Sequence, residues 1–348
     1  MRKVIGILLC LQSFCIVAQT DKKMSYHEID PPFYRVDTLK YKDLPSGVKH
    51  TGRHSAGLYV DFKTNSKSIK ASWCVNPAPA FSYLSEVNRR GLDLYAKVEG
   101  VYQYVRSGFP DTVKDCTEAV IIDQLTGEER EYRLYFPVYS ELATLQIGVE
   151  EEATFQETPT TYKKRVLVYG SSIAQGASAS RPGMAYPAQL ERKLGHEFLN
   201  YGFGGSAKME ASVAELLADI PAVDLLIMDC VPNSSVAEIK QRTAAFVAIY
   251  RKKNPQVPIV MIPSVIREVG YFNTVIGQRV TAQNQQFRIE YEALIKEGVQ
   301  NIYYLDVEHL LGTDHEGTSD GVHPTDLGFA RWIETVQPHL EQVFNRYF

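Results

Sequence analysis

Short stretches in which hydrophobic and polar residues alternate dominate the chain between residues 25 and 155. Alternation with a period of two is typical of strands that bury one face. We find it at residues 57–63, 68–73, 92–98, 131–136 and 144–149. Turn-forming residues separate these stretches, and no long helical pattern interrupts them. The pattern therefore predicts an N-terminal β-sandwich of a jelly-roll-like kind.

The pattern changes after an acidic, threonine-rich stretch that runs to Thr161. From there, short apolar runs suited to buried strands alternate with segments of helical period. The apolar runs are 165–169, 225–228, 258–262 and 302–305, and the helical segments are 185–194, 211–217, 239–252, 280–297 and the C-terminus. Such an order predicts a parallel sheet with helices on both faces. We expect a β-domain at 25–155, a linker at 156–163 and an α/β domain at 164–348.

The first residues of the chain have the pattern of an export signal. A short positive start, Met-Arg-Lys, precedes a nearly unbroken apolar run from Val4 to Val17. We expect a signal peptide at 1–18 with cleavage after Ala18, and a secreted or periplasmic mature protein. A membrane anchor is the alternative, but the run falls short of the roughly 20 residues that span a bilayer. No stable membrane insertion is expected after the signal is removed, and Cys10 and Cys15 lack the pattern of a lipoprotein cleavage site.

Length and charge narrow the class of protein. A chain of 348 residues suits two domains, each with its own core. The net charge is -4 and no run of Lys and Arg appears, so nucleic acid is not an expected partner. Without the signal, Cys74, Cys116 and Cys230 remain, and none forms a Cys-x-x-Cys motif. A Cys74–Cys116 disulfide is one possibility that the sequence leaves open.

Polar residues suited to acyl transfer follow three of the predicted strands, where functional groups of parallel sheets gather. The first group is Gly-Ser-Ser-Ile at 170–173, directly after the strand 165–169. A serine at a tight strand-to-helix turn presents its hydroxyl at the sheet edge, beside a backbone N–H. The motif is not Gly-x-Ser-x-Gly, because position 174 is Ala. Serines that merely cap a helix are the alternative for this group.

The second group is Asn-Tyr-Gly-Phe-Gly-Gly-Ser at 200–206, where glycines let the backbone approach a ligand. Residues 202–207 also match the dinucleotide pattern Gly-x-Gly-x-x-Ala, with Asp224 near the ribose-binding distance. We reject that interpretation, since the match is not in the first βα unit and an exported chain rarely meets NAD. The third group contains Asn233, whose side-chain N–H suits an oxyanion. A glycosylation sequon and a plain loop asparagine are the alternatives for it.

A fourth group, Asp-Gly-Val-His at 320–323, lies near the C-terminus. Its spacing brings a carboxylate to one imidazole nitrogen while the other faces outward, which sets the tautomer that a general base needs. Several nearby residues suggest a metal site: Asp306, Glu308, His309, Asp314, His315 and Glu316. They have no recognisable ligand spacing, so we interpret them as solvated charges and expect no metal.

Together, the four groups resemble the SGNH/GDSL hydrolase superfamily, which implies a flavodoxin-like α/β/α domain and a serine esterase. Matched position by position, Ser172 is the nucleophile and its backbone N–H the first oxyanion donor. Gly205 supplies the second oxyanion donor and Asn233 the third. His323 is the base, and Asp320 is the acid that orients it.

The chain departs from the usual family motifs at two places. Gly-Asp-Ser reads Gly-Ser-Ser at 170–172, and Gly-x-Asn-Asp reads Val-Pro-Asn-Ser at 231–234. These variants resemble one bacterial subgroup, in which Ser-Arg-Pro-Gly (here 180–183) accompanies an N-terminal β-domain with a Gly-x-Asp-Leu-Tyr motif (here 91–95). We expect Asp93 of that motif to have a structural role at a strand edge, not a catalytic one.

The resemblance to two-domain carbohydrate esterases implies hydrolysis of short acyl esters, acetyl above all, on carbohydrate, with no cofactor. Residues 175–183 are mostly small or polar, and we expect them to line a shallow acyl pocket. A lipase or lysophospholipase is one alternative. A carbohydrate-binding protein without activity is another, although Ser172, Asn233, Asp320 and His323 are intact. Whether water or a sugar accepts the acyl group stays open.

Overall fold

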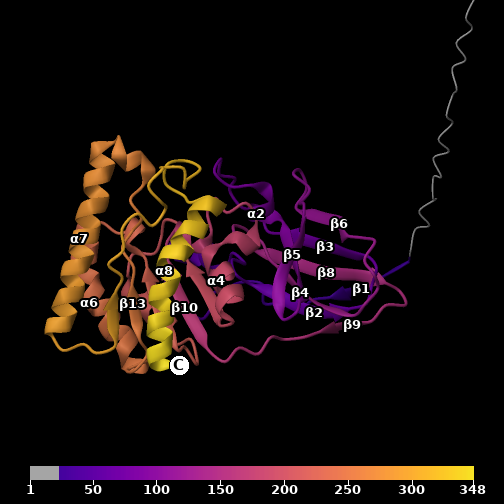
Figure 1. The fold of residues 1–348 in the computed structure, drawn as a ribbon, viewed down its shortest axis with the longest axis horizontal. Coiled ribbons are helices and arrows are strands. Elements are labelled where there is room, and N and C mark those ends of the chain that lie inside the picture. Colours follow the sequence, from indigo (N-terminus) through magenta and orange to yellow (C-terminus); the bar gives the residue numbers. More distant parts are fainter. Residues whose placement is uncertain (1–22) are drawn as a thin grey trace, which may run out of the picture.

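The computed structural model describes residues 23–348, so the predicted signal peptide and its cleavage site lie outside the described residues. The chain forms a β-domain and an α/β domain, which lie next to each other along the long axis of the molecule (Figure 1). Within residues 23–348, no helix has the length and apolar character that crossing a membrane requires.

The β-domain consists of two antiparallel sheets, as the alternating pattern predicts. One sheet has the strand order β1-β8-β3-β6 and the other has the order β5-β4-β7-β2-β9. The strands are β1 (Met24–Glu28), β2 (Tyr59–Thr64), β3 (Ile69–Val75), β4 (Leu92–Val98), β5 (Val101–Gly108), β6 (Cys116–Ile122), β7 (Arg130–Tyr135), β8 (Leu142–Glu150) and β9 (Phe155–Glu157). Strand β9 pairs with β2, so the segment between the domains starts with the end of a strand.

Side chains from both sheets fill one core, which includes the fully buried Trp73. Cys74 and Cys116 lie opposite each other on the neighbouring strands β3 and β6 and form a disulfide. The pairing that the sequence left open is therefore present, and Cys230 is a buried free thiol.

The connection from β1 to β2 leaves the sandwich and packs on the other domain. It contains helix α1 (Ser46–Gly52), and its buried residues Val36, Leu44 and Val48 belong to a core of the α/β domain. Arg35 is buried in the same region and donates to the carbonyl oxygens of Asn200 (2.8 Å) and Gly202 (2.7 Å). This connection therefore places part of the β-domain at the end of an α/β strand. A second short helix, α2 (Glu86–Arg90), precedes β4.

The α/β domain has a five-stranded parallel sheet in the order β11-β10-β12-β13-β14, the flavodoxin-like order. Its strands are β10 (Arg165–Gly170), β11 (Glu197–Gly202), β12 (Leu225–Asp229), β13 (Ile259–Met261) and β14 (Ile302–Tyr304). Its α-helices are α3 (Ser172–Gln175), α4 (Tyr186–Leu194), α5 (Ala211–Ala218), α6 (Val236–Lys253), α7 (Thr274–Lys296) and α8 (Asp326–Tyr347), and its short 3₁₀ helices are η1 (Pro182–Met184), η2 (Val231–Asn233) and η3 (Glu268–Tyr271).

Each face of the parallel sheet is covered by helices, because successive side chains of a buried strand point to opposite faces. Leu167 and Tyr169 of β10 pack with α5, α6 and α7, whereas Val166 and Val168 pack with α4 and α8. Figure 1 shows α6 and α7 at the outer end of the molecule, and α4 between the sheet and the β-domain. The predicted fold class is confirmed.

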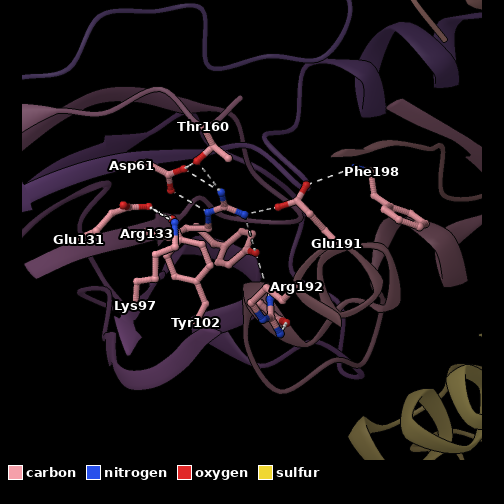
Figure 2. Close-up of polar contacts among 11 residues, drawn as sticks. Asp61, Lys97, Tyr102, Glu131, Arg133, Thr160, Glu191, Arg192 and Phe198 are labelled. Atoms are coloured by element: carbon pink, nitrogen blue, oxygen red, sulfur yellow. Dashed lines mark hydrogen bonds and ion pairs between the residues drawn. The ribbon is translucent and has the colours of Figure 1, made fainter. Parts of the chain in front are cut away.

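A buried charged network joins the two domains (Figure 2). Arg133 of β7 forms a bidentate pair with Asp61 of β2, with both N–O distances at 2.7 Å. Its remaining guanidinium nitrogen contacts Glu191 of α4, and the side chain of Arg133 has no exposed surface. Glu191 also accepts from the backbone N–H of Phe198 at 3.2 Å. The guanidinium thus bridges carboxylates from both domains.

Candidate active site

Two adjacent serines at the carboxyl end of β10 take different roles in the structure. Ser171 is the N-cap of α3 and accepts a hydrogen bond from the backbone N–H of Ile173 at 3.2 Å. Its own N–H donates to the carbonyl oxygen of Asp229 at the end of β12. Ser172 is the first residue of the helix, and its hydroxyl is left free for another partner. Helix capping therefore explains Ser171 and not Ser172.

Ser172 lies within hydrogen-bond distance of His323, although 151 residues separate them. The Ser172 Oγ–His323 Nε2 distance is 3.0 Å, and His323 Nδ1 lies 2.7 Å from Asp320 Oδ2. A carboxylate accepts, so the proton of the neutral imidazole resides on Nδ1. His323 Nε2 is then free to accept from the serine hydroxyl, which is the arrangement that a general base needs.

The loop before α8 holds Asp320 in place. Its Oδ1 accepts from the backbone N–H groups of Val322 (2.9 Å) and His323 (2.7 Å). Partial burial acts to raise the pKa of Asp320, but the hydrogen bonds from the backbone and imidazole of His323 outweigh burial, and the pKa is lowered. The carboxylate is therefore ionised when it faces His323.

Ser172 and His323 open into a cavity of about 410 Å³ between the two domains. The residues that line it are His50, Thr51, His54, Phe81, Tyr83, Tyr139, Ser172, Ile173, Gly204, Gly205, Pro232, Asn233, Arg267, Val322 and His323. Asp320 does not line the cavity. The structure thus brings four of the five predicted site residues to one surface, with Asp320 behind the imidazole.

The two remaining predicted oxyanion residues come from neighbouring strand ends. Gly205 follows β11 with φ of +71°, a conformation that favours glycine, and no heavy atom lies within 4 Å of where its Cβ would be. Asn233 ends η2 after β12, and its Nδ2 donates to the carbonyl oxygen of Phe203 at 3.3 Å. An amide nitrogen carries two hydrogens, so one stays available to the cavity. Gly205 and Asn233 therefore line the same cavity as Ser172.

Each of the two domains matches a known protein family. A GDSL-like lipase/acylhydrolase family matches residues 163–341. The chain belongs to this family. The N-terminal domain of SGNH-hydrolase-type esterases, named for its Gly-x-Asp-Leu-Tyr motif, matches residues 15–155. The protein is therefore an SGNH-type ester hydrolase with the β-domain of the predicted subgroup.

Solved structures share the two-domain fold of this GDSL-like hydrolase. A Bacteroides ovatus protein described as GDSL-like lipase is 43% identical, with a TM-score of 0.90 over 93% of this chain and 98% of that one. A salicylyl-acyltransferase from a tetracycline biosynthetic pathway is 20% identical, with a TM-score of 0.72 over 94% and 96%. A family two carbohydrate esterase from Cellvibrio japonicus is 13% identical, with a TM-score of 0.61 over 93% and 99%. A search of curated proteins gave no match.

The β-domain contributes one wall of the hydrolase cavity, which no pattern in the sequence predicts. Tyr83 stacks on His323, with ring centroids 4.4 Å apart. Tyr139 donates from its hydroxyl to the carbonyl oxygen of Ser172 at 3.4 Å. His54 lies in the connection that contains α1 and lines the same cavity. No local motif marks these three residues, because their role depends on how the domains pack.

The prediction that residues 175–183 line the acyl pocket is wrong, since none of them lies on the cavity wall. Helix α3 ends at Gln175, and the next residue, Gly176, caps the helix in a left-handed conformation. Gln175 is fully buried, and its Oε1 accepts from the backbone N–H of Gly204 at 2.9 Å. Gln175 therefore supports the cavity wall from behind.

Asp93 ties the motif at 91–95 to the segment at 180–183. Its Oδ2 accepts from Arg181 Nη1 (2.6 Å) and from the backbone N–H of Gly183 (2.9 Å), and the residue is fully buried. Burial raises the pKa of Asp93, although Arg181 and these hydrogen bonds oppose the increase. The expected strand-edge position is wrong, because β4 pairs with both β5 and β7. The carboxylate is an interdomain anchor.

Three of the charged residues weighed as metal ligands have other partners. Asp306 pairs with Arg288, Asp314 with Arg331, and His315 Nδ1 lies 2.8 Å from Glu268. Across residues 23–348, no cluster of three or more His, Cys, Asp or Glu side chains is arranged to hold a metal ion.

Proposed function

We propose that this SGNH-type hydrolase is an exported serine esterase that removes short acyl groups, acetyl above all, from carbohydrate. Ser172 is the nucleophile, His323 the base and Asp320 the acid that orients the base. The observation that carries the proposal is the 3.0 Å distance from Ser172 Oγ to His323 Nε2, with Asp320 at the other imidazole nitrogen.

The reaction is a two-step acyl transfer. His323 takes the proton of Ser172 as the serine oxygen attacks the ester carbonyl, and the imidazolium then gives this proton to the leaving alcohol. The backbone N–H groups of Ser172 and Gly205 and the side chain of Asn233 stabilise the negative charge on the tetrahedral oxygen. Water attacks the acyl-enzyme in the second step with His323 again as base.

The lining of the cavity favours a small acyl group and a polar alcohol. Its aliphatic side chains are Ile173, Pro232 and Val322, whereas imidazole, hydroxyl, guanidinium and aromatic groups form much of the rest. A long acyl chain needs an extended apolar groove, and only three aliphatic side chains line this cavity. Phe81 stands partly exposed at the cavity, with 42% of its surface accessible, and offers a face for a sugar ring.

Two solved structures with this fold carry names of esterases that act on carbohydrate, which supports the substrate class. One is the family two carbohydrate esterase of Cellvibrio japonicus, and the other is an acetyl xylan esterase from Butyrivibrio proteoclasticus, 13% identical with a TM-score of 0.54. Export is supported by the disulfide between Cys74 and Cys116, since disulfides persist in oxidising compartments. The mass of the mature protein tests this part, with Gln19 expected as its first residue.

A serine-reactive fluorophosphonate tests the nucleophile. Wild-type protein should be labelled at Ser172, and Ser172→Ala should lose both labelling and esterase activity. Ser171→Ala is the matched control, because it removes a helix cap at a cost of about 1 kcal/mol and leaves the nucleophile in place. Labelling of Ser172→Ala, or more than a few per cent of wild-type turnover, would exclude this mechanism.

A panel of esters with one leaving group tests the acyl preference. We expect kcat/KM for acetyl to exceed that for octanoyl by far, and the reverse order would contradict the carbohydrate assignment. Repeating the acetyl reaction with a sugar alcohol present separates hydrolysis from transfer, since an acyltransferase would form the sugar acetate.

A further inference from the structure

A chain of hydrogen bonds determines the tautomer of His54. The backbone N–H of Gly204 donates to Gln175 Oε1 at 2.9 Å, and Gln175 Nε2 donates to the carbonyl oxygen of Val138 at 3.1 Å. These two backbone partners settle which end of the Gln175 amide is oxygen and which is nitrogen. His54 Nδ1 lies 3.1 Å from Gln175 Nε2, which can only donate. His54 Nδ1 is therefore an acceptor, and the neutral ring carries its proton on Nε2.

The surroundings keep this ring neutral. Burial is the main cause, and the charge of Arg35 and the neighbouring His50 add to it, so that the pKa of His54 is lowered to about 3. Arg35 lies close because its Nε donates to the carbonyl oxygen of His54 at 2.9 Å. A protonated His54 would also point an N–H at the amide N–H of Gln175.

Within residues 23–348, the Nε2–H of His54 has no hydrogen-bond partner. His54 Nε2 is also not among the fully buried polar atoms that lack a partner, so it keeps some accessible surface. His54 is only 5% exposed, and it lines the cavity that holds Ser172 and His323. A donor placed in this way, almost fully desolvated and open on one side, suits a hydrogen bond to a bound ligand.

We infer that His54 is a specificity-determining residue of the active site, whose Nε2–H donates to an oxygen of the sugar that carries the ester. This inference rests on the proposed function. An acetyl ester has two oxygens: the three oxyanion donors take the carbonyl oxygen, and the leaving oxygen faces His323, which gives it a proton. The oxygen that meets His54 therefore belongs to the alcohol portion, as a hydroxyl or ring oxygen. The β-domain thereby takes part in choosing the substrate.

Two substitutions separate this role from a structural one. In His54→Asn, the amide oxygen can replace Nδ1 as acceptor for Gln175, and the donor at the position of Nε2 is lost. In His54→Gln, the amide nitrogen can replace Nε2 as donor, and the acceptor for Gln175 is lost. One substrate is a methyl glucoside acetylated at its primary hydroxyl, and the other is cyclohexylmethyl acetate. Both carry the same acyl group, but only the alcohol of the first has hydroxyl and ring oxygens.

We expect wild-type protein and His54→Gln to prefer the sugar ester. His54→Asn should lose about tenfold in kcat/KM on the sugar ester, mainly through KM, the usual effect of one hydrogen bond. Its kcat/KM on cyclohexylmethyl acetate should change less than about twofold. Should His54→Asn fail to fold, the comparison of His54→Gln with wild-type protein still applies: a lost preference in the folded His54→Gln overturns the inference.

The opposite pattern, with His54→Asn normal and His54→Gln impaired on both esters, would assign His54 to the support of Gln175 and overturn the inference. Equal loss on both esters in both variants, no loss in either, or no preference in wild-type protein would overturn it as well. These outcomes are independent of the proposed nucleophile and acyl preference, which the labelling of Ser172 and the acetyl–octanoyl comparison test.

Discussion

The rings of Tyr83 and His323 stack face to face, with centroids 4.4 Å apart and an interplanar angle of 21°. Tyr83 belongs to the β-domain and His323 to the α/β domain. Tyr83 also stacks with Phe81, at a centroid distance of 5.4 Å. The proposed base thus contacts both Asp320, which accepts a hydrogen bond from its Nδ1, and an aromatic face from another domain.

Tyr83→Ala should lower kcat by roughly two- to thirtyfold, because an aromatic face stabilises a neighbouring cation by about 0.5–2 kcal/mol and His323 becomes a cation during catalysis. Tyr83→Phe keeps the ring and should retain nearly full activity. Steady-state kinetics on an acetyl ester measures both. A loss in Tyr83→Ala that appears only in KM would instead show that Tyr83 binds substrate.

His323→Ala should abolish turnover, whereas Asp320→Asn should be less damaging. In Asp320→Asn, the oxygen that binds the backbone N–H groups of Val322 and His323 still holds the loop in place. The amide nitrogen then faces Nδ1 as a donor, which favours the wrong imidazole tautomer and keeps the loss large, but His323 remains as a base. The rate of fluorophosphonate labelling reports the reactivity of Ser172 in both variants. Equal losses would show that the charge of Asp320 is indispensable, and no loss in Asp320→Asn would mean that another group orients the imidazole.

Asn233→Ala should reduce kcat by ~10²–10³ with little change in KM, the usual effect of removing one oxyanion donor. In the structure, Asn233 Nδ2 is oriented by the carbonyl oxygen of Phe203. Ser235→Ala is a suitable control, since Ser235 caps the following helix α6 and does not line the cavity. If the loss in Asn233→Ala were confined to KM, Asn233 would bind the ground state and not the transition state.

Asp229→Asn should stabilise the protein at pH 8 more than at pH 5. Burial raises the pKa of Asp229 to about 7, although Tyr186 donates to its carboxylate at 3.0 Å. Between the ordinary pKa of 3.8 and about 7, the folded state holds a proton that the unfolded state has lost. Wild-type stability therefore falls as pH rises through this range, and the variant lacks this component. Thermal unfolding at several pH values measures the difference; a parallel pH dependence in both proteins would disprove it.

Arg133→Met should lower the free energy of unfolding by about 3–5 kcal/mol, because it leaves Asp61 and Glu191 buried without their counter-charge. Lys253→Met is the control, since its pair with Asp219 is largely exposed and should contribute less than about 1 kcal/mol. Urea unfolding compares the two variants. Similar small losses in both would mean that water or rearranged side chains solvate the carboxylates of Figure 2.

The sequence by itself determined the fold types of the two domains and the residues of the α/β domain that are suited to acyl transfer. Both follow from local patterns: alternation predicts strands with one buried face, and alternating apolar strands and helices predict a parallel sheet. Because the carboxyl ends of parallel strands meet at one edge, Ser172, Gly205 and Asn233 were expected to lie together. The structure places all three at one cavity with His323, and their catalytic roles stay predictions.

Only the tertiary structure decided what the β-domain adds to the site. Tyr83 and His54 reach the cavity because the domains pack through Arg35, Asp93 and Arg133, and no pattern near these residues specifies a partner in another domain. The disulfide between Cys74 and Cys116 likewise depends on strands β3 and β6 being neighbours, which their separation of 42 residues does not reveal. Local spacing predicts which side chains lie at the end of a strand or in a turn. The register of strands and the packing of one domain on another depend on the whole chain.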